Sequence, residues 1–259
     1  MRPTEVLPGL FTIRSKLIVN VFWIVDGNSV TLIDTGLAGS ADKILRGIAA
    51  CGRQPRDVRD ILVTHCHRDH AGSLAALKQR TGATTYMHPL DAELVRQGRC
   101  MRTLYPTPRF TARLMHRLLV GNARPESFHV EPVQVDREIG DGEDLPLAGG
   151  IRAIHAPGHC AGQLAFLWQR HGGVLFAADS AANVRRLNLS PVYEEIELGR
   201  QSLTKLSALS FENTCFGHGR PIIGGADREF RRLWPPSENP KSPPKSAEPI
   251  AERSASDNF

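Results

Sequence analysis

The sequence of 259 residues predicts an α/β fold in which two packed β-sheets carry helices on their outer faces. Strand-like runs rich in β-branched and aromatic residues come first, strands and helices then mix, and short strands return before the last helices. The hydrophobic share of 41% is enough for an ordinary buried core. This order of elements is typical of two sheets that pack together with helices outside.

The first half of the chain contains strands that end in glycine or aspartate turns. We expect these strands at 10–14, 20–25, 29–36, 60–65 and 84–88. A helix is expected at 40–51, where Ile44, Leu45 and Ile48 share one face. A second helix is expected at 72–82, closed by Gly82. The strand at 60–65 is short and apolar, and it leads directly into a cluster of histidines.

The second half has a similar rhythm of strands and helices, without an internal repeat at the level of identity. We expect its strands at 128–135, 151–156, 163–168, 173–179 and 213–219. Helices are expected at 199–210 and near 225–233.

One catalytic domain is expected over residues 1–234, with a basic helical insertion at about 90–125 and a disordered tail at 235–259. The tail is rich in proline, serine and charge, so it cannot bury enough apolar surface to offset its ordering entropy. The insertion carries a run of arginines without an acidic residue among them: Arg96, Arg99, Arg102, Arg109, Arg113, Arg117 and Arg124. That field favours an anionic ligand, although a solvated basic face explains it equally well.

The segment 110–121 of the insertion predicts an amphipathic basic helix. Its arginines lie on one side, and its apolar side carries Phe110, Leu114, Met115, Leu118 and Leu119. Such a helix can be a lid, lie on a membrane surface or pack against the core. Packing against the core is the commonest of these outcomes.

Composition also predicts where the protein works. No run approaches the roughly 18–20 apolar residues that span a membrane, and the N-terminus lacks the apolar region and cleavage site of a secretory signal. The cysteines at positions 51, 66, 100, 160 and 215 are odd in number, scattered, and form no CxxC motif. We therefore expect a reduced, cytoplasmic protein without a disulfide framework.

The segment VTHCHRDHAG places His65, His67, Asp69 and His70 within six positions. In an extended segment alternate residues point the same way, so His65 and His67 can reach one metal ion. Asp69 and His70 lie where a helix begins, and their side chains can reach a second point nearby. Imidazole nitrogens and carboxylates are metal ligands, and the cluster therefore predicts a metal site.

Further ligands must come from distant segments, because four residues do not complete two metal shells. His159 lies in a Pro/Gly turn, Asp179 ends an apolar strand, and His218 lies in a glycine-flanked turn after a strand. Each is placed at a strand end, where rigid backbone can aim a side chain into a shared cleft. Glycine beside each histidine lets the loop approach the metal closely.

These motifs, in this order and rough spacing, resemble those of the metallo-β-lactamase superfamily over nearly all of residues 5–233. The resemblance rests on His65-x-His67-x-Asp69-His70, Gly158-His159, Asp179, Gly217-His218-Gly219, and TLIDTG with Asp34. It implies a four-layer αβ/βα sandwich.

The resemblance also implies a centre of two metal ions, expected to be zinc, with iron or manganese as alternatives. The implied ligands are His65, His67 and His159 for the first ion, Asp69, His70 and His218 for the second, and Asp179 as the bridge. Asp69 and Asp179 are the expected catalytic carboxylates, and Asp34 would steady the loops. Metal coordination lowers the pKa of bound water to about 7, so hydroxide can attack a carbonyl group.

Within the superfamily, the sequence favours a glyoxalase-II-like hydrolase of a thioester, ester or lactone that bears an anionic group. The helical C-terminal domain and the glutathione-binding motif of glyoxalase II proper are not recognisable. Acyl-homoserine lactonases carry a tyrosine shortly after the bridging aspartate. Here Tyr193 is distant in sequence from Asp179, so this class is less favoured. His67 argues against flavo-diiron reductases, which carry glutamate there.

Two other classes stay open. A persulfide dioxygenase-like oxidoreductase would hold a single iron on His65, His159 and Asp179. A non-catalytic binding protein could use the same scaffold, although all seven ligands are present. No nucleic-acid partner is expected, since the chain shows neither an extra domain nor a recognition arm.

Overall fold

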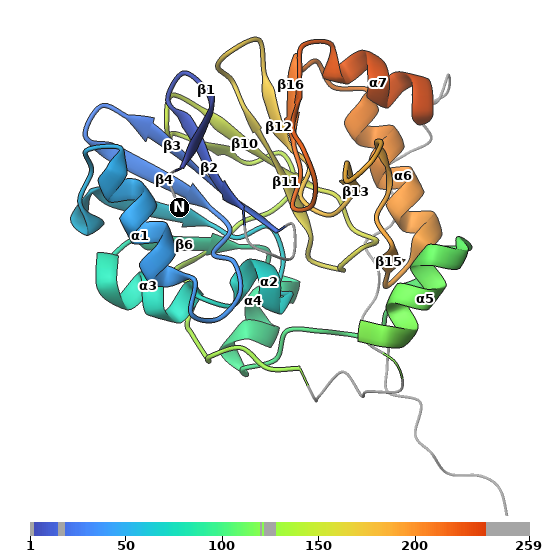
Figure 1. The fold of residues 1–259 in the computed structure, drawn as a ribbon, viewed down its shortest axis with the longest axis horizontal. Helices are drawn as coiled ribbons and strands as arrows, with labels where there is room; N and C mark the ends of the chain where they lie inside the picture. Colours follow the sequence, from blue (N-terminus) through green and yellow to red (C-terminus); the bar gives the residue numbers. More distant parts are fainter. Residues whose placement is uncertain (1–2, 15–18, 120, 122–127, 237–259) are drawn as a thin grey trace, which may run out of the picture.

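The computed structural model describes residues 3–14, 19–119, 121 and 128–236. They form two β-sheets packed face to face, with helices on both outer faces (Figure 1). This arrangement confirms the predicted four-layer αβ/βα sandwich. Of the tail predicted at 235–259, residues 237–259 lie outside the described residues.

The first sheet has seven strands in the order β1-β2-β3-β4-β5-β6-β8. Their bounds are β1 Thr4–Leu7, β2 Leu10–Arg14, β3 Asn20–Asp26, β4 Ser29–Ile33, β5 Val58–Leu62, β6 Thr84–Met87 and β8 Arg137–Glu138. The first four strands are antiparallel, whereas β4, β5, β6 and β8 run parallel. The carboxyl ends of the parallel strands therefore meet at one edge, where ligands bind in open α/β sheets.

The second sheet has six strands in the order β17-β16-β12-β11-β10-β9. Their bounds are β9 Asp144–Leu145, β10 Ile151–His155, β11 Leu164–Trp168, β12 Val174–Phe176, β16 Asn213–Cys215 and β17 Ile222–Ile223. Two short ribbons accompany it. They pair β13 Ala181–Ala182 with β14 Asn188–Leu189, and β7 Tyr105–Pro106 with β15 Val192–Tyr193.

Helices cover the outer face of each sheet (Figure 1). The first sheet carries α1 Ala41–Ala50 and α3 Leu74–Thr81, and the second carries α6 Ile196–Ser207 and α7 Ala226–Leu233. Shorter or peripheral elements are η1 Pro55–Asp57, α2 Arg68–Ala71, α4 Pro89–Arg96 and α5 Phe110–Leu119. As predicted, Gly82 closes α3, and its φ of 70° is left-handed. In the described part of the chain, no helix is both long and apolar enough to cross a membrane.

Alternating side chains divide the interior into three apolar layers. In β3, Phe22 and Ile24 face the core between the sheets, whereas Trp23 faces the helices of the first sheet. In β11, Phe166 belongs to the central core and Leu167 to the layer under α6 and α7. Because a one-residue slip would reverse every face, this two-sided burial fixes the strand register.

Residues 128–135 do not form the strand expected there. Within this described segment only His129 makes a β-bridge, an isolated one to Arg99. Pro132 cannot donate a ladder hydrogen bond, and the apolar Phe128 and Val130 pack on the outer core of the first sheet instead. The alternating pattern therefore reflects an irregular segment buried on one side.

The helix expected in the insertion is present as α5, but its apolar side is open. Phe110 is 80% exposed, Leu114 46% and Leu118 74%. These three side chains therefore do not pack against the core. The helix follows β7, and β7 pairs with β15 of the second half of the chain.

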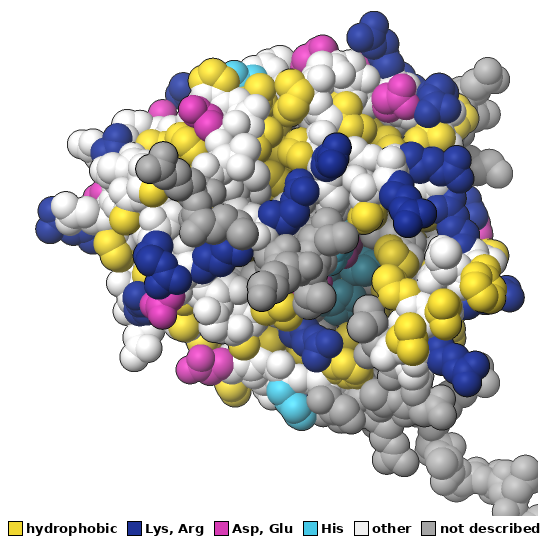
Figure 2. All heavy atoms as spheres, in the orientation of Figure 1, with side chains coloured by type: hydrophobic (Ala, Val, Ile, Leu, Met, Phe, Trp, Pro, Cys, Tyr) yellow, Lys and Arg dark blue, Asp and Glu magenta, His cyan; other side chains and the backbone are white. Residues whose placement is uncertain are grey.

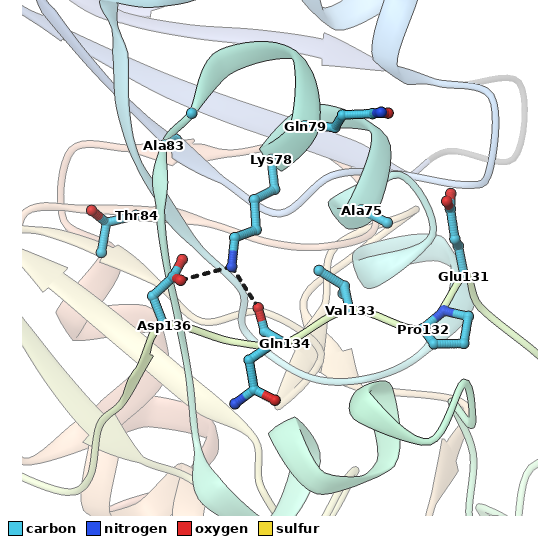
Figure 3. Close-up of a pocket in the computed structure, with 11 residues that line it drawn as sticks. Ala75, Lys78, Gln79, Ala83, Thr84, Glu131, Pro132, Val133, Gln134 and Asp136 are labelled. Atoms are coloured by element: carbon cyan, nitrogen blue, oxygen red, sulfur yellow. Dashed lines mark hydrogen bonds and ion pairs between the residues drawn. The ribbon is translucent and has the colours of Figure 1, made fainter.

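A recess of about 600 Å³ lies beside α3 and the segment that leads into β8 (Figure 3). The Lys78 Nζ crosses it and donates to Asp136 Oδ1 and to the Gln134 carbonyl oxygen, each at 2.7 Å. None of the predicted metal ligands lines this recess. The candidate site lies elsewhere.

Candidate metal centre

The structure gathers all seven predicted ligands at the edge where strands of both sheets end. The first sheet supplies His65, His67, Asp69 and His70 after β5, and the second supplies His159 after β10, Asp179 after β12 and His218 after β16. Figure 2 shows histidine side chains at the bottom of a hollow, with basic and hydrophobic side chains around its rim.

The first set consists of His65, His67 and His159, whose ligand atoms all lie within 4.8 Å of one another. All three residues are buried. His159 Nε2 lies 3.0 Å from His67 Nδ1. Two nitrogens on one tetrahedral zinc ion would be about 3.3 Å apart, so this spacing suits a shared ion.

Hydrogen bonds fix which nitrogen of these rings carries a lone pair. The single proton of the Thr64 hydroxyl goes to Asp34, 2.9 Å away, so His65 Nδ1 donates to Thr64 Oγ1 at 3.0 Å. His159 Nδ1 donates to the Val192 carbonyl oxygen at 2.8 Å. A neutral His65 or His159 therefore presents an Nε2 lone pair to the centre, as a metal ligand must.

The second set consists of Asp69, His70 and His218. His218 Nε2 lies 3.3 Å from Asp69 Oδ2, and His70 Nε2 lies 3.8 Å from the same oxygen. The side chains of Asp69 and His218 are 25% and 23% exposed, whereas that of His70 is fully buried. The centre therefore opens to solvent on the side of the second set.

Asp179 lies between the two sets. Its Oδ2 is 3.6 Å from His159 Nε2 and 3.1 Å from His218 Nε2, and its Oδ1 is 3.7 Å from His70 Nε2. One carboxylate thus faces ring nitrogens of both sets. This is the geometry that a bridging ligand requires.

Unpartnered buried atoms show that the residues fit a metal ion. Among the described residues, His65 Nε2, His70 Nε2 and Asp179 Oδ1 are buried without a hydrogen-bond partner. Leaving such a group unpaired costs about 1–3 kcal/mol. Three of them around one centre are explained if cations supply the missing partners.

The two sets differ in their electrostatics. Burial, together with the neighbouring histidines, lowers the pKa of His65 well below its usual value, and burial and His159 lower the pKa of His67 to about 3. Burial alone would also lower the pKa of His70, but Asp179, Asp34 and Asp69 raise it to about 9. In the same way Asp179 and Asp69 overcome burial and raise the pKa of His218.

The carboxylates respond in the opposite direction. Burial would raise the pKa of Asp179, but His218 and His70 hold it well below its usual range. His70 and His218 likewise lower the pKa of Asp69, although burial alone would raise it. Both groups are therefore charged acceptors at neutral pH.

Asp34 ties the early strand-end motif to the ligand loop, as the family resemblance implied. Its Oδ1 accepts from the Thr64 backbone N–H at 2.8 Å, and its Oδ2 lies 2.8 Å from His70 Nδ1. Asp34 adopts a left-handed φ of 62°, and Ala178, just before Asp179, adopts 49°. Such conformations cost about 1–3 kcal/mol each and concentrate at functional sites.

The turn that carries His218 is held by the opposite sheet. Asn20, the first residue of β3, donates from Nδ2 to the carbonyl oxygens of Phe216 and Gly219, at 2.9 and 2.8 Å. A Cβ atom on Gly217 would lie 2.1 Å from Asp179 Oδ1. Glycine is therefore required beside His218, as expected from the sequence.

A buried polar network behind the ligands was not predicted. Asp91 accepts from the backbone N–H groups of Cys66 and Gly162, both at 3.1 Å, and from Arg102 Nη1 at 2.9 Å. Glu194 accepts from the Ala161 backbone N–H at 2.9 Å. The network joins both ligand loops. No motif marks its members, which only the fold brings together.

His88, His155 and Tyr193 have structural partners. His88 caps α4 and stacks on His155 with a ring separation of 4.2 Å, and His155 Nε2 donates to the Ala161 carbonyl oxygen. Tyr193 is buried beside His159, and its hydroxyl donates to the Ser180 carbonyl oxygen at 2.6 Å. The polar atoms of these side chains are therefore engaged in structural contacts.

Comparisons with known proteins agree with this geometry. A family model described as the metallo-beta-lactamase superfamily matches residues 14–218. The uncharacterized protein YobT of Bacillus subtilis is 31% identical over 164 residues, 62% of this chain and 61% of YobT. The chain thus spans less than two thirds of YobT. The probable metallo-hydrolase YflN of the same organism is 25% identical over 226 residues, 80% of this chain and 83% of YflN.

Among solved structures, the subclass B3 metallo-beta-lactamase BJP-1 of Bradyrhizobium japonicum is similar with a TM-score of 0.67. The likeness covers 90% of each chain at 23% identity. At that identity it shows a shared fold.

Proposed function

The chain belongs to the metallo-beta-lactamase superfamily, and from this membership we propose that it is a metal-dependent hydrolase that cleaves a thioester, ester or lactone. The proposal includes two zinc ions per chain, held by the two ligand sets, and a reduced cytoplasmic setting. It is supported most by Asp179, whose two oxygens face His159 of the first set and His70 and His218 of the second.

The proposed ligands are those that the sequence predicted. His65, His67 and His159 would hold one ion, Asp69, His70 and His218 the other, and Asp179 both. A divalent ion in such a site lowers the pKa of bound water to about 7 and polarises a carbonyl oxygen. No serine, cysteine or histidine nucleophile is then needed.

The chain's own residues would orient the reaction. Asp69 and Asp179 both lie within 3.3 Å of His218 Nε2 and stay charged at neutral pH, so they would accept hydrogen bonds from an attacking water. The substrate enters from the side of Asp69 and His218, because the other ligands are almost fully buried. Buried walls on the remaining sides exclude competing water.

We propose that the insertion forms one wall of the substrate hollow. Val192 of β15 holds His159, and β15 pairs with β7, which leads into α5. In α5 the apolar Leu114 is partly exposed and Arg113 is exposed. Such a surface suits a substrate with an apolar part and an anionic group. Arg102 would not contact the anion, because Asp91 and Glu194 already pair with it.

Elemental analysis and a substrate screen test the proposal together. Purified protein should contain two zinc ions per chain and hydrolyse at least one thioester, ester or lactone, and activity should be lost with chelation and return with zinc. One iron per chain with oxygen uptake on a persulfide would instead support the oxygenase. A metallated protein that cleaves no carbonyl substrate would contradict the hydrolase.

An acyl-homoserine lactone belongs in the screen as the less favoured substrate. Because the Tyr193 hydroxyl is committed to Ser180 and Ser190, it cannot also bond a substrate without breaking those contacts. We therefore expect open-chain thioesters or esters to be the better substrates.

A further inference from the structure

Two cysteine side chains meet behind the metal centre. Cys66 lies between His65 and His67, and Cys160 directly follows His159. Their sulfur atoms are 3.5 Å apart, and both residues are fully buried. They therefore link the ligand loop of the first sheet to that of the second.

The surroundings of this pair are polar rather than apolar. Asp91 accepts from the backbone N–H of Cys66, and the Cys160 thiol lies 3.3 Å from Glu194 Oε1. Arg102 Nη1 lies 3.6 Å from Cys160 Sγ and 2.9 Å from Asp91 Oδ1. The Arg102 guanidinium pairs with both Asp91 and Glu194, so a cationic group already stands between the carboxylates where a further metal ion would bind.

We propose that Cys66 and Cys160 are a site of reversible disulfide formation. A peroxide is the oxidant: two thiols and hydrogen peroxide give one disulfide and two water molecules, so each sulfur loses its proton and the two electrons reduce the O–O bond. A dithiol reductant reverses the reaction by exchange. In a reducing compartment such a bond would form transiently, as a response to oxidant.

The bond would disturb the first ligand set. A disulfide holds its sulfurs about 2.05 Å apart, so the present 3.5 Å separation must shrink and draw the two loops together. Residues adjacent in the chain, His67 and His159, already approach to 3.0 Å. Oxidation should therefore weaken metal retention; this consequence rests on the proposed function, whereas bond formation does not.

One ion pair separates the buried thiols from solvent. The side chain of Arg102 is 28% exposed and that of Glu194 11%, and they bond to each other beside Cys160. Local opening there would admit peroxide. Replacing Glu194→Gln should weaken the ion pair while leaving an oxygen for the Ala161 N–H, and should therefore speed the reaction.

Peptide mapping tests the bond directly. After peroxide treatment of the purified full chain, alkylation and trypsin digestion without reduction, residues 60–68 and 153–170 should appear as one linked species. Its mass should lie two hydrogens below the sum of the peptides, and dithiothreitol should abolish it. All five cysteines fall in different tryptic peptides, so each is scored separately.

Matched variants separate this pair from ordinary buried thiols. Cys66→Ala and Cys160→Ala should lose the linked species, whereas Cys215→Ala, which removes an equally buried cysteine, should keep it. Alkylation of both thiols without a link, or addition of oxygen to them, would overturn the proposal. So would protection of both sulfurs by a metal ion that a chelator releases.

The consequence for the metal has its own readout. Bound metal per chain, measured after desalting, should fall as the linked fraction rises, recover on reduction, and stay constant in Cys160→Ala relative to its own untreated sample. A linked protein that keeps all its metal would confirm the modification and refute its effect on the centre. A failure of the hydrolase proposal would leave the linked peptide unchanged.

Discussion

The two halves of the candidate centre are built from similar residues but in different states. His65, His67 and His159 are buried, and their pKa values are lowered, so they are neutral donors at pH 7. His70 and His218 lie against carboxylates that raise their pKa values. Identical imidazoles therefore bear different charges a few ångströms apart, because Asp34, Asp69 and Asp179 gather on one side.

This difference shows how one site can combine a half that is ready to bind a cation with a half that stays protonated until a cation arrives. The first half needs no proton to leave before a cation binds, whereas the second half holds its protons until a cation displaces them. The protons also neutralise carboxylates that would otherwise repel one another in a buried space. The second half is the one that opens to solvent, where its charge is easier to carry.

The largest expected effect comes from removing the residue that the halves share. Asp179→Ala should reduce kcat/KM by about a thousandfold or more, because both ions lose a ligand and a charge. The variant should also retain less than one ion per chain by elemental analysis. Asp144→Asn, which alters an exposed carboxylate paired with Arg152, is the matched control. Full metal content and activity in Asp179→Ala would refute the bridging role.

Variants that lack one histidine should show whether the two halves bind their ions independently. His67→Ala should empty the first position and His70→Ala the second, so each protein is expected to hold about one ion instead of two, with turnover reduced by about a hundredfold or more. Elemental analysis and steady-state kinetics measure both. His171→Ala removes an exposed imidazole whose Nε2 bonds to the Pro8 carbonyl oxygen, and it should change neither. Loss of both ions from either variant would mean that the positions are not independent.

Asp34→Asn should lower the metal affinity of the second half more than that of the first. The amide cannot pair with a charged His70, and we expect about a 10–100-fold weaker affinity for the second ion. Competition with a chelator measures the two affinities separately. If Asp34 served only general stability, both affinities and the melting temperature would fall together.

The pH dependence of metal binding should differ between the halves. His70, with a pKa of about 9, is protonated at lower pH, and the pKa of His218 is raised as well, so binding at the second position should weaken by at least about tenfold for each pH unit below 9. His67, with a pKa of about 3, is already neutral above that value, so the first position should stay nearly constant from pH 9 to pH 6. Calorimetry in buffers of different ionisation enthalpy should count the released protons. If metal affinity depended on pH equally at both positions, the proposed difference between the two halves would be wrong.

The sequence predicted the fold and the seven residues that meet, because each motif can be recognised from its local residue pattern. His65 and His67 alternate after a strand, and glycines flank His159 and His218. Their role as ligands stays a prediction, although the structure brings them together.

The supporting residues could not be found in this way. Asp91, Arg102 and Glu194 act through contacts between distant segments, and no spacing in the chain encodes such contacts. The strand expected at 128–135 was wrong for a related reason: buried alternate residues beside Pro132 imitate a sheet pattern without any ladder. Local patterns identify strand ends and glycine turns, but not what packs behind them.

Each set of ligands draws on both sheets, which has a mechanical consequence. A cation held by His67 and His159, or by His70 and His218, would act as a cross-link between the two layers, in addition to the apolar packing and the hydrogen bonds that already join them. Its binding energy would then add to the cohesion of the whole sandwich.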